Sequence, residues 1–122
     1  MTTNTTIRPS WLKDHPQDLI FRHRLASNTI LGEVWYRPID LGFEIDYIEI
    51  HDSYRGHGLS INILNAFVEF CRSTHLGAEI WLEVSDLNIP AIKLYLRAGF
   101  KNVGLRKNYY QDGSDAILMS LK

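Results

Sequence analysis

A glycine-containing loop between a predicted strand and a predicted helix has the residue types of an anion-binding site. The strand ends near His51, the loop reads Arg55-Gly56-His57-Gly58-Leu59-Ser60, and a helical pattern follows at once. Successive backbone N–H groups at a helix start, with glycines that allow close approach, suit a pyrophosphate. The loop lacks the Gly-Lys-Ser/Thr of a P-loop and the Gly-x-Gly-x-x-Gly spacing of dinucleotide-binding folds. A glycine turn that only reverses the chain is the alternative.

Glu83 and Tyr95 carry groups that can move a proton, but their own positions do not assign them that role. Glu83 alternates with Leu82 and Val84, which is typical of a solvated strand residue. Tyr95 shares a helical face with Ile92, and this periodicity favours a core aromatic side chain. A catalytic role for either residue can therefore be inferred only from the motifs around it.

The hydrophobic pattern predicts the elements that position these residues. The first half reads as a hairpin and a third strand, in which Ile48 and Ile50 point one way and Tyr47 and Glu49 the other. An amphipathic helix, a strand, a helix with Asn88 as N-cap and a second hairpin follow. The ranges are strands Leu19–Leu25, Ile30–Tyr36 (closed by Pro38) and Phe43–His51; helix Leu59–Leu76, capped by Gly77; strand Glu79–Val84; helix Asn88–Gly99; and strands Lys101–Tyr110 and Asp115–Leu121, joined by a turn at Gln111–Ser114.

This order of elements, βββ, α, β, α, ββ, predicts an α/β (α+β) fold with a mixed, mostly antiparallel sheet and helices packed on it. The 122 residues fit a single domain, 1–122, in which residues 1–18 form a short, partly flexible lead-in with one turn or short helix near Trp11–Gln17. Hydrophobic residues make up 45% and charged residues 22%, as in an ordinary globular protein.

Charge, cysteine content and hydropathy exclude several classes of function. A net charge of -1 gives no basic excess for binding nucleic acid. One cysteine, Cys71, forms no internal disulfide and is too little for a structural zinc site, so we expect no metal. It falls on the apolar stripe of its helix, which favours a core thiol over a nucleophile. No secretory signal and no membrane span are expected, which predicts a cytoplasmic protein.

Several motifs in order resemble the GNAT superfamily of acetyl-CoA-dependent N-acetyltransferases, closest to the RimI-like branch that acetylates the N-terminal alanine of a ribosomal protein. The resemblance covers about Leu19 to Leu121. It is carried by Tyr54-Arg55-Gly56-His57-Gly58-Leu59, Leu82-Glu83-Val84, Asn88, Ala91-Ile92-Lys93-Leu94-Tyr95, Gly99-Phe100, Arg106-Lys107-Asn108-Tyr109-Tyr110 and Asp115-Ala116-Ile117-Leu118-Met119.

The resemblance implies that acetyl-CoA lies in a V-shaped opening between strands 43–51 and 79–84. Backbone groups of one strand would hold the pantetheine arm, and the loop amides would take the pyrophosphate. The implied cofactor-binding residues are Ile48, Glu49, Ile50, Arg55, Gly56, His57, Gly58, Leu59, Ser60, Ile61 and Asn88. The family prefers Gly or Ala at Ser60 and often Arg or Lys at Ile61, so we expect weaker cofactor affinity. His57 would donate to a phosphate when protonated, or is simply exposed.

In the resembled branch the glutamate of the Leu-Glu-Val strand is the general base and the tyrosine of the next helix the general acid, which implies these roles for Glu83 and Tyr95. Deprotonating an α-amine at pH 7 costs about 1.4 kcal/mol, against about 4.6 kcal/mol for a lysine. A lone carboxylate working through water therefore suits a peptide or protein N-terminus. A backbone N–H of the 48–50 stretch would meet the oxyanion. Glu49 is a rival base or a salt-bridged edge residue.

Three alternatives stay open at this point. The acceptor is a protein N-terminus, or a small amine or polyamine, or the chain is a non-catalytic CoA-binding module. Strand alternation predicts that Tyr109 and Tyr110 point to opposite sheet faces, one of them into the acceptor cleft. The family normally has a strand and two helices before the hairpin, so reduced or absent N-terminal helices are expected here. A homodimer would cover the apolar surface that those helices would otherwise bury.

Overall fold

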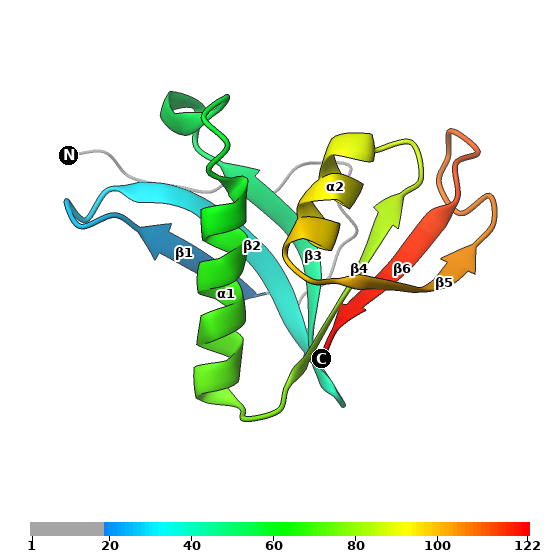
Figure 1. Cartoon of the computed structure of the whole chain (residues 1–122), viewed down its shortest axis with the longest axis horizontal. Coiled ribbons are helices and arrows are strands. Elements are labelled where there is room, and N and C mark those ends of the chain that lie inside the picture. The colour runs from blue at the N-terminus through cyan, green and yellow to red at the C-terminus, as the bar shows by residue number, and fades with distance from the viewer. Residues whose placement is uncertain (1–18) are drawn as a thin grey trace.

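The computed structural model describes residues 19–122, which form one six-stranded sheet with two helices on it (Figure 1). The sheet order is β1-β2-β3-β4-β6-β5, and only the β3–β4 pair is parallel. The elements are β1 (Leu19–Arg24), β2 (Ile30–Ile39), β3 (Gly42–Ile50), the 3-10 turn η1 (Asp52–Tyr54), α1 (Ser60–Thr74), β4 (Glu79–Ser85), α2 (Ile89–Arg97), β5 (Lys101–Arg106) and β6 (Ala116–Leu121).

This arrangement confirms the predicted mixed sheet, its element order and its helices. The predictions for the flexible lead-in, the turn near Trp11–Gln17 and the reduced N-terminal helices lie outside the described residues. Within residues 19–122, no helix is long and apolar enough to cross a membrane. The same range holds no group of three His, Cys, Asp or Glu side chains that would bind a metal ion.

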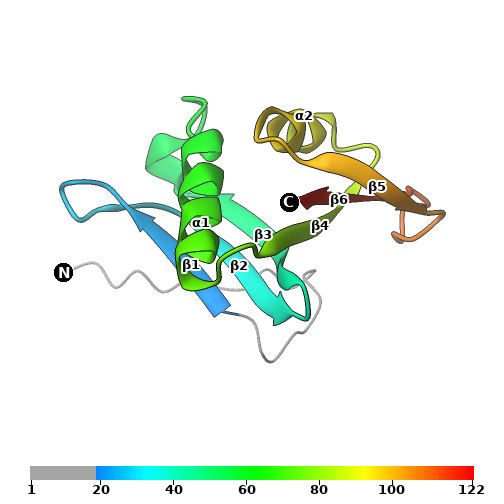
Figure 2. The same cartoon turned by 60° about the horizontal axis from the view of Figure 1, so that its bottom comes forward.

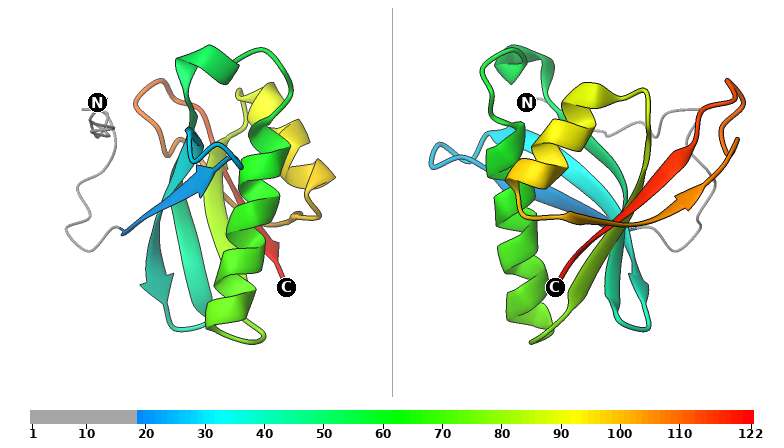
Figure 3. Two further views of the ribbon diagram at one scale, coloured as in Figure 1. Left: turned by 90° about the vertical axis from the view of Figure 1, so that its left-hand side faces the viewer. Right: turned by 45° about the vertical axis from the view of Figure 1, so that its right-hand side comes forward.

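Both helices lie on the same face of the sheet, with α1 over the first strands and α2 beyond it toward β5 (Figures 2 and 3). The apolar stripe of α1 supplies the fully buried Ile63, Leu64 and Phe67, which pack on residues such as Val34 of β2 and Ile80 of β4. The packing of α1 on the sheet also positions the loop between β3 and α1, because α1 begins directly after this loop.

The predicted helix 59–76 is too long at both ends. The observed α1 begins one residue later, at Ser60, and ends two residues earlier, at Thr74. α1 ends at Thr74, because His75 is extended, and its N–H still bonds the Cys71 carbonyl at 2.9 Å. Gly77 is therefore not the cap. It lies in the following turn at φ +77°, which glycine adopts without strain.

The second helix begins and ends as its sequence predicts. The Asn88 side chain accepts a hydrogen bond from the Ala91 N–H at 3.3 Å, which satisfies one of the free donors of the first turn of α2. Gly99 follows the last helical residues at φ +100° and donates to the Leu96 carbonyl. The cap and the glycine set the length of α2 and so the position of Tyr95 over the sheet.

Two predicted strand ends are wrong by three residues or more, and the others agree within one residue. β2 runs through Pro38 to Ile39. Pro38 pairs with Phe43 of β3 but lies beyond the end of the β1–β2 ladder, where Leu19 stands opposite Tyr36. Proline is tolerated there because that edge of β2 needs no ladder hydrogen bond to β1. β5 stops at Arg106, well before Tyr110, because Asn108 takes φ +51° and donates its N–H to Asp115 Oδ1 at 2.9 Å.

The same turn overturns the predicted alternation of the two tyrosines that follow β5. Tyr109 and Tyr110 lie in the connection to β6, and their rings meet edge to face with centroids 5.1 Å apart. They therefore do not point to opposite faces of a strand.

Candidate active site

The sheet opens between its two parallel strands. β3 and β4 pair from Gly42 opposite Glu79 to Ile45 opposite Leu82, and no further. Both strands continue, β3 to Ile50 and β4 to Ser85, and Figure 1 shows them diverging toward α2. This is the predicted V-shaped opening.

A β-bulge marks the point where the strands separate. On the other side of β3, Trp35 pairs with Tyr47 and Tyr36 with Ile45, so Asp46 is the extra residue of the bulge. A bulge bends its strand and increases the local twist. The bend turns the second half of β3 away from β4.

Strand alternation directs backbone groups of Ile48 and Ile50 into this opening. The His51 N–H bonds the Leu31 carbonyl at 2.9 Å, so the backbone of residue 51, and by alternation of residue 49, faces β2. The N–H and carbonyl groups of residues 48 and 50 then face the opposite way. The Ile50 carbonyl confirms this direction, because it accepts the Arg55 Nε–H at 3.0 Å.

The loop after β3 adopts a conformation that needs its glycines. Gly56 and Gly58 have φ of +81° and +68°, where other residues are strained. A Cβ added at either position would meet no atom of residues 19–122 within 4 Å. The glycines are therefore required by the backbone conformation and not by packing. Space in front of the loop and of the first turn of α1 is left open by the described residues. The first N–H groups of α1 have no intrahelical partner there, and no side chain of residues 19–122 caps them.

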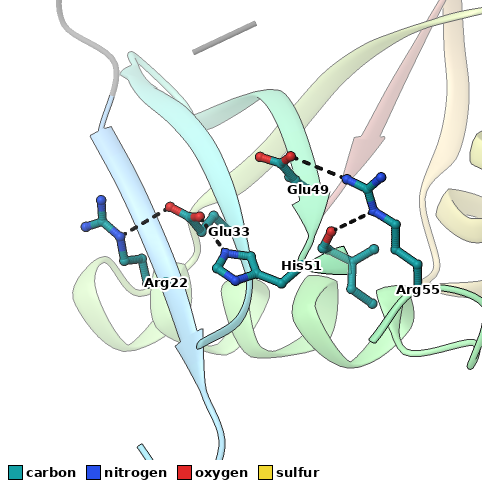
Figure 4. Close-up of polar contacts among 6 residues, drawn as sticks. Arg22, Glu33, Glu49, His51 and Arg55 are labelled. Atoms are coloured by element: carbon teal, nitrogen blue, oxygen red, sulfur yellow. Dashed lines mark hydrogen bonds and ion pairs between the residues drawn. The ribbon is translucent and has the colours of Figure 1, made fainter. Parts of the chain in front are cut away.

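Arg55 fastens the loop to the end of β3 (Figure 4). Besides the Ile50 carbonyl, its guanidinium contacts Asp52 Oδ1 at 3.0 Å and Glu49 Oε1 at 3.5 Å. The predicted rival base, Glu49, is thus held in an ion pair, and 28% of its side chain is exposed.

A buried carboxylate that the sequence did not single out lies beside this contact. Glu33 is 2% exposed and pairs with Arg22 Nε at 3.2 Å and with His51 Nε2 at 2.9 Å (Figure 4). It stands opposite Glu49 in the β2–β3 register. Its position in an alternating strand gave no signal of burial. A buried charge is stable only when it is paired. The Glu33 ion pairs therefore connect β1 and β2 to His51, the residue that precedes the loop.

A cleft of about 240 Å³ lies between the start of α1 and one face of α2. Its lining comprises Gly58, Ser60, Ile61, Pro90, Lys93, Leu94 and Arg97. The predicted loop residues Gly58, Ser60 and Ile61 form one wall. Sequence reasoning missed Lys93 and Arg97 on the other wall, although two cations four residues apart on a helix share a face.

Glu83 and Tyr95 lie on opposite faces of the sheet. Ile80, Leu82 and Val84 of β4 are buried under the helices, so Glu83 points to the other face, where 23% of its side chain is exposed and Arg106 Nε lies 3.5 Å from Oε1. Tyr95 belongs to α2 on the helix face and stacks edge to face on Phe100.

Tyr110 links these two residues electrostatically. Burial and then the neighbouring Tyr110 raise the pKa of Tyr95 to about 12. Burial and then the negative charges of Glu83 and Asp112 raise the pKa of Tyr110. Tyr110 therefore lies within interaction range of both Glu83 and Tyr95. The sequence could not predict this, because it placed Tyr110 in a strand.

The remaining predicted residues divide between the loop and the core. His57 is exposed in the loop, and Asn88 is exposed at the start of α2 with its amide oxygen engaged in the cap. Cys71 is fully buried, which raises the pKa of its thiol to about 12. A thiol so protonated is not a nucleophile at neutral pH, as its position on the apolar stripe predicted.

The model of the acetyltransferase (GNAT) family matches residues 2–100. The chain is 32% identical over 115 residues to an N-alpha-acetyltransferase of Saccharolobus solfataricus, which covers 84% of this chain and 68% of the relative. It is 39% identical over 77 residues to a putative ribosomal protein bS18-alanine N-acetyltransferase of Bacillus subtilis, covering 62% of this chain and 50% of the relative. A streptothricin acetyltransferase of Streptomyces lavendulae is 36% identical over 81 residues, covering 63% of this chain and 42% of the relative.

Solved structures share the fold. The ribosomal-protein-S18-alanine N-acetyltransferase of Escherichia coli superposes with a TM-score of 0.71 at 27% identity, over 88% of this chain and 70% of that one. A GNAT family acetyltransferase of Elizabethkingia anophelis with acetyl-CoA bound gives a TM-score of 0.74 at 18% identity, over 88% and 77% of the two chains. The matches to the bacillar and streptomycete relatives span half of those proteins or less.

Proposed function

This chain belongs to the acetyltransferase (GNAT) family, and on that basis we propose that it transfers acetyl from acetyl-CoA to the α-amine of a peptide or protein N-terminus. The relatives named N-alpha-acetyltransferase and bS18-alanine N-acetyltransferase support this class of acceptor. The observation that carries the proposal is the opening between β3 and β4, with a carboxylate on one face and a protonated tyrosine on the other.

The residues around the opening fit acetyl-CoA. Ile48 and Ile50 would hold the pantetheine arm through their backbone groups, and the open loop from Gly56 to Ile61 would take the pyrophosphate. When bound, acetyl-CoA supplies the thioester carbonyl that the amine attacks. A backbone N–H of the 48–50 stretch would meet the charge on its oxygen, and residue 48 has this group free of β2.

Glu83 is the proposed general base. It is part exposed, so water can relay the proton of an incoming ammonium group to the carboxylate. An N-terminal α-amine, with pKa near 8, needs only this modest help, whereas a lysine needs about 3 kcal/mol more. Arg106 Nε lies 3.5 Å from Glu83 Oε1 and holds the carboxylate in place.

Tyr95 is the proposed general acid. With a pKa of about 12 it stays protonated at any working pH. A thiol has a pKa of about 8.5, so complete transfer of the tyrosine proton to a free thiolate is unfavourable by roughly 5 kcal/mol. The hydroxyl therefore acts mainly as a hydrogen-bond donor that stabilises the departing sulfur.

Small amines are the second candidate class of acceptor, because the streptothricin acetyltransferase match covers 63% of this chain. In that case Glu49, on the same face of the sheet as Glu33, would act as the base or bind the acceptor cation. The two classes differ in the essential carboxylate and in the preferred acceptor length.

Release of free CoA thiol tests the proposal. The protein is mixed with acetyl-CoA and with peptides that begin in Ala, Ser or Met, with polyamines, and with the same peptides blocked at the N-terminus. We expect turnover with the free peptides only. The buried Cys71 does not react with the thiol reagent in the folded chain. Cofactor binding without turnover across the panel would leave a CoA-binding module.

We also propose a homodimer in the cytoplasm. β5 is the last strand of the sheet, and its Val103 and Leu105 are 48% and 52% exposed, which makes it a template for pairing with a second chain. Light scattering is expected to give twice the 14.1 kDa chain mass. Leu105→Lys should shift the protein to monomer, whereas Leu76→Lys, at a position 94% exposed, should not.

A further inference from the structure

We infer that Lys93 and Arg97 bind the 3′-phosphate of CoA in the cleft between α1 and α2, and so replace the cation that Ile61 does not supply. The inference rests on the proposed function, because it assigns one end of the proposed cofactor. It goes beyond the pyrophosphate loop, which lies on the opposite wall of the same cleft.

The cleft connects the loop to a second set of groups. Gly58, Ser60 and Ile61 at the start of α1 form one wall. The other wall is one face of α2 and extends from Pro90 through Lys93 to Arg97. Arg97 lies seven positions beyond Pro90, about 10 Å along the helix, so this wall extends over two turns of α2. A ligand that enters at the loop and continues along α2 meets both cations.

The loop itself has little side-chain charge to offer a phosphate. The Arg55 guanidinium is already engaged by the Ile50 carbonyl, Asp52 and Glu49. Ile61, where a cation would reach into the cleft, is apolar. Backbone amides remain for the diphosphate, but they all lie at the helix start.

Lys93 and Arg97, in contrast to the loop, offer side-chain charge to a phosphate. Both are exposed, and neither forms an ion pair with a carboxylate within residues 19–122. They project from the same face of α2 into the cleft, one turn apart. A phosphate monoester carries about 1.5 to 2 negative charges at pH 7, more than either phosphate of a diester-linked diphosphate. Two adjacent cations on the wall opposite the loop match that group.

The test compares CoA with 3′-dephospho-CoA, which differ only in this phosphate. Calorimetric titration of both ligands is carried out on the unmodified chain, on Lys93→Gln/Arg97→Gln and on Lys93→Gln alone. Arg72→Gln/Lys122→Gln is the control with the same loss of charge. Arg72 donates to the Lys122 carbonyl near the other end of α1, about 18 Å along the helix from Ser60.

We expect the unmodified chain and the control to bind CoA at least about tenfold more tightly than 3′-dephospho-CoA, since one charge-assisted contact accounts for such a factor. In the double variant the two affinities should agree within about twofold, through loss of CoA affinity alone. The single variant should lie between. Thermal melting of each variant verifies that it is folded.

Four results would overturn the inference, and they separate it from the proposed function. Equal affinity of the unmodified chain for both ligands, or no loss of affinity for either ligand in the double variant, removes the 3′-phosphate site and leaves the proposed function intact. An equal loss of affinity for both ligands in the double variant would place the cations on the diphosphate instead. If neither ligand binds, the proposed function fails as well.

Discussion

Ile45 and Leu82 are the last residues at which β3 and β4 pair, and the proposed base Glu83 and the backbone groups of Ile48 and Ile50 lie beyond that pair. Glu83 is the next residue of β4, and the bulge at Asp46 is the next position of β3. The same point in the sheet thus ends the ladder, frees the backbone of the second half of β3 and exposes the carboxylate. The predictions below test how this opening works.

Replacing Glu83 with Gln should reduce kcat by about 100- to 1,000-fold, because the amide cannot accept the proton of the acceptor. The affinity for acetyl-CoA should stay within about twofold. Glu49→Gln is the matched control on the neighbouring strand, expected to retain most of the activity. Steady-state rates with a peptide beginning in alanine measure both variants. A larger loss in Glu49→Gln than in Glu83→Gln would identify Glu49 as the base and favour a small-amine acceptor.

The pH dependence of kcat/KM should rise toward pH 8 and then level, because the acceptor α-amine loses its proton in that range. Tyr95 adds no alkaline decline below about pH 11, since its pKa is raised to about 12 and the proton stays on the hydroxyl. Tyr95→Phe should lower the whole profile by about 100-fold without moving the rising limb. A decline near pH 9 that disappears in Tyr95→Phe would show that the pKa of this hydroxyl is not raised.

Gly58→Ala separates the backbone requirement of the loop from ligand binding. Its φ of +68° costs roughly 1 kcal/mol for alanine, and so does the φ of +84° at Gly113 in the turn before β6. Both substitutions meet open space, so their free energies of unfolding should fall alike. Only Gly58→Ala should weaken acetyl-CoA binding, because a methyl group there stands between the ligand and the loop amides. Equal cofactor affinity in the two variants would exclude the loop as the binding surface.

Gly32 lies against the strand that forms one side of the opening. A Cβ at this position would collide with Ile63 Cδ1 and with the Glu49 carbonyl oxygen. Gly32→Ala should therefore lower the free energy of unfolding by about 2 kcal/mol or more. Gly104→Ala in β5 is the control, because its Cβ would make an ordinary contact of 3.6 Å with Leu118. Chemical denaturation of both variants measures the difference; equal losses would mean that β3 yields freely at this point.

The sequence by itself determined the elements whose apolar spacing is regular. Ile63, Leu64, Phe67 and Cys71 recur every three or four residues, and this period can be satisfied only by a helix with one buried face. Asn88 and Gly99 marked the ends of α2 because each supports a local backbone conformation. Glu83 and Tyr95 were selected by their motifs, and in the structure they lie on opposite faces of the sheet.

Only the tertiary structure decided what depends on contacts between distant segments. The course of the chain after Arg106 follows from the Asn108–Asp115 contact. This contact removed Tyr110 from its predicted strand and brought it within interaction range of Glu83 and of Tyr95. The burial of Glu33 arises from Arg22 and His51 on two neighbouring strands. Lys93 and Arg97 of α2 became candidate phosphate-binding residues only because the structure places them across a cleft from Ile61. Local patterns cannot encode these relations, because charge pairing and cleft geometry depend on how strands and helices meet in space.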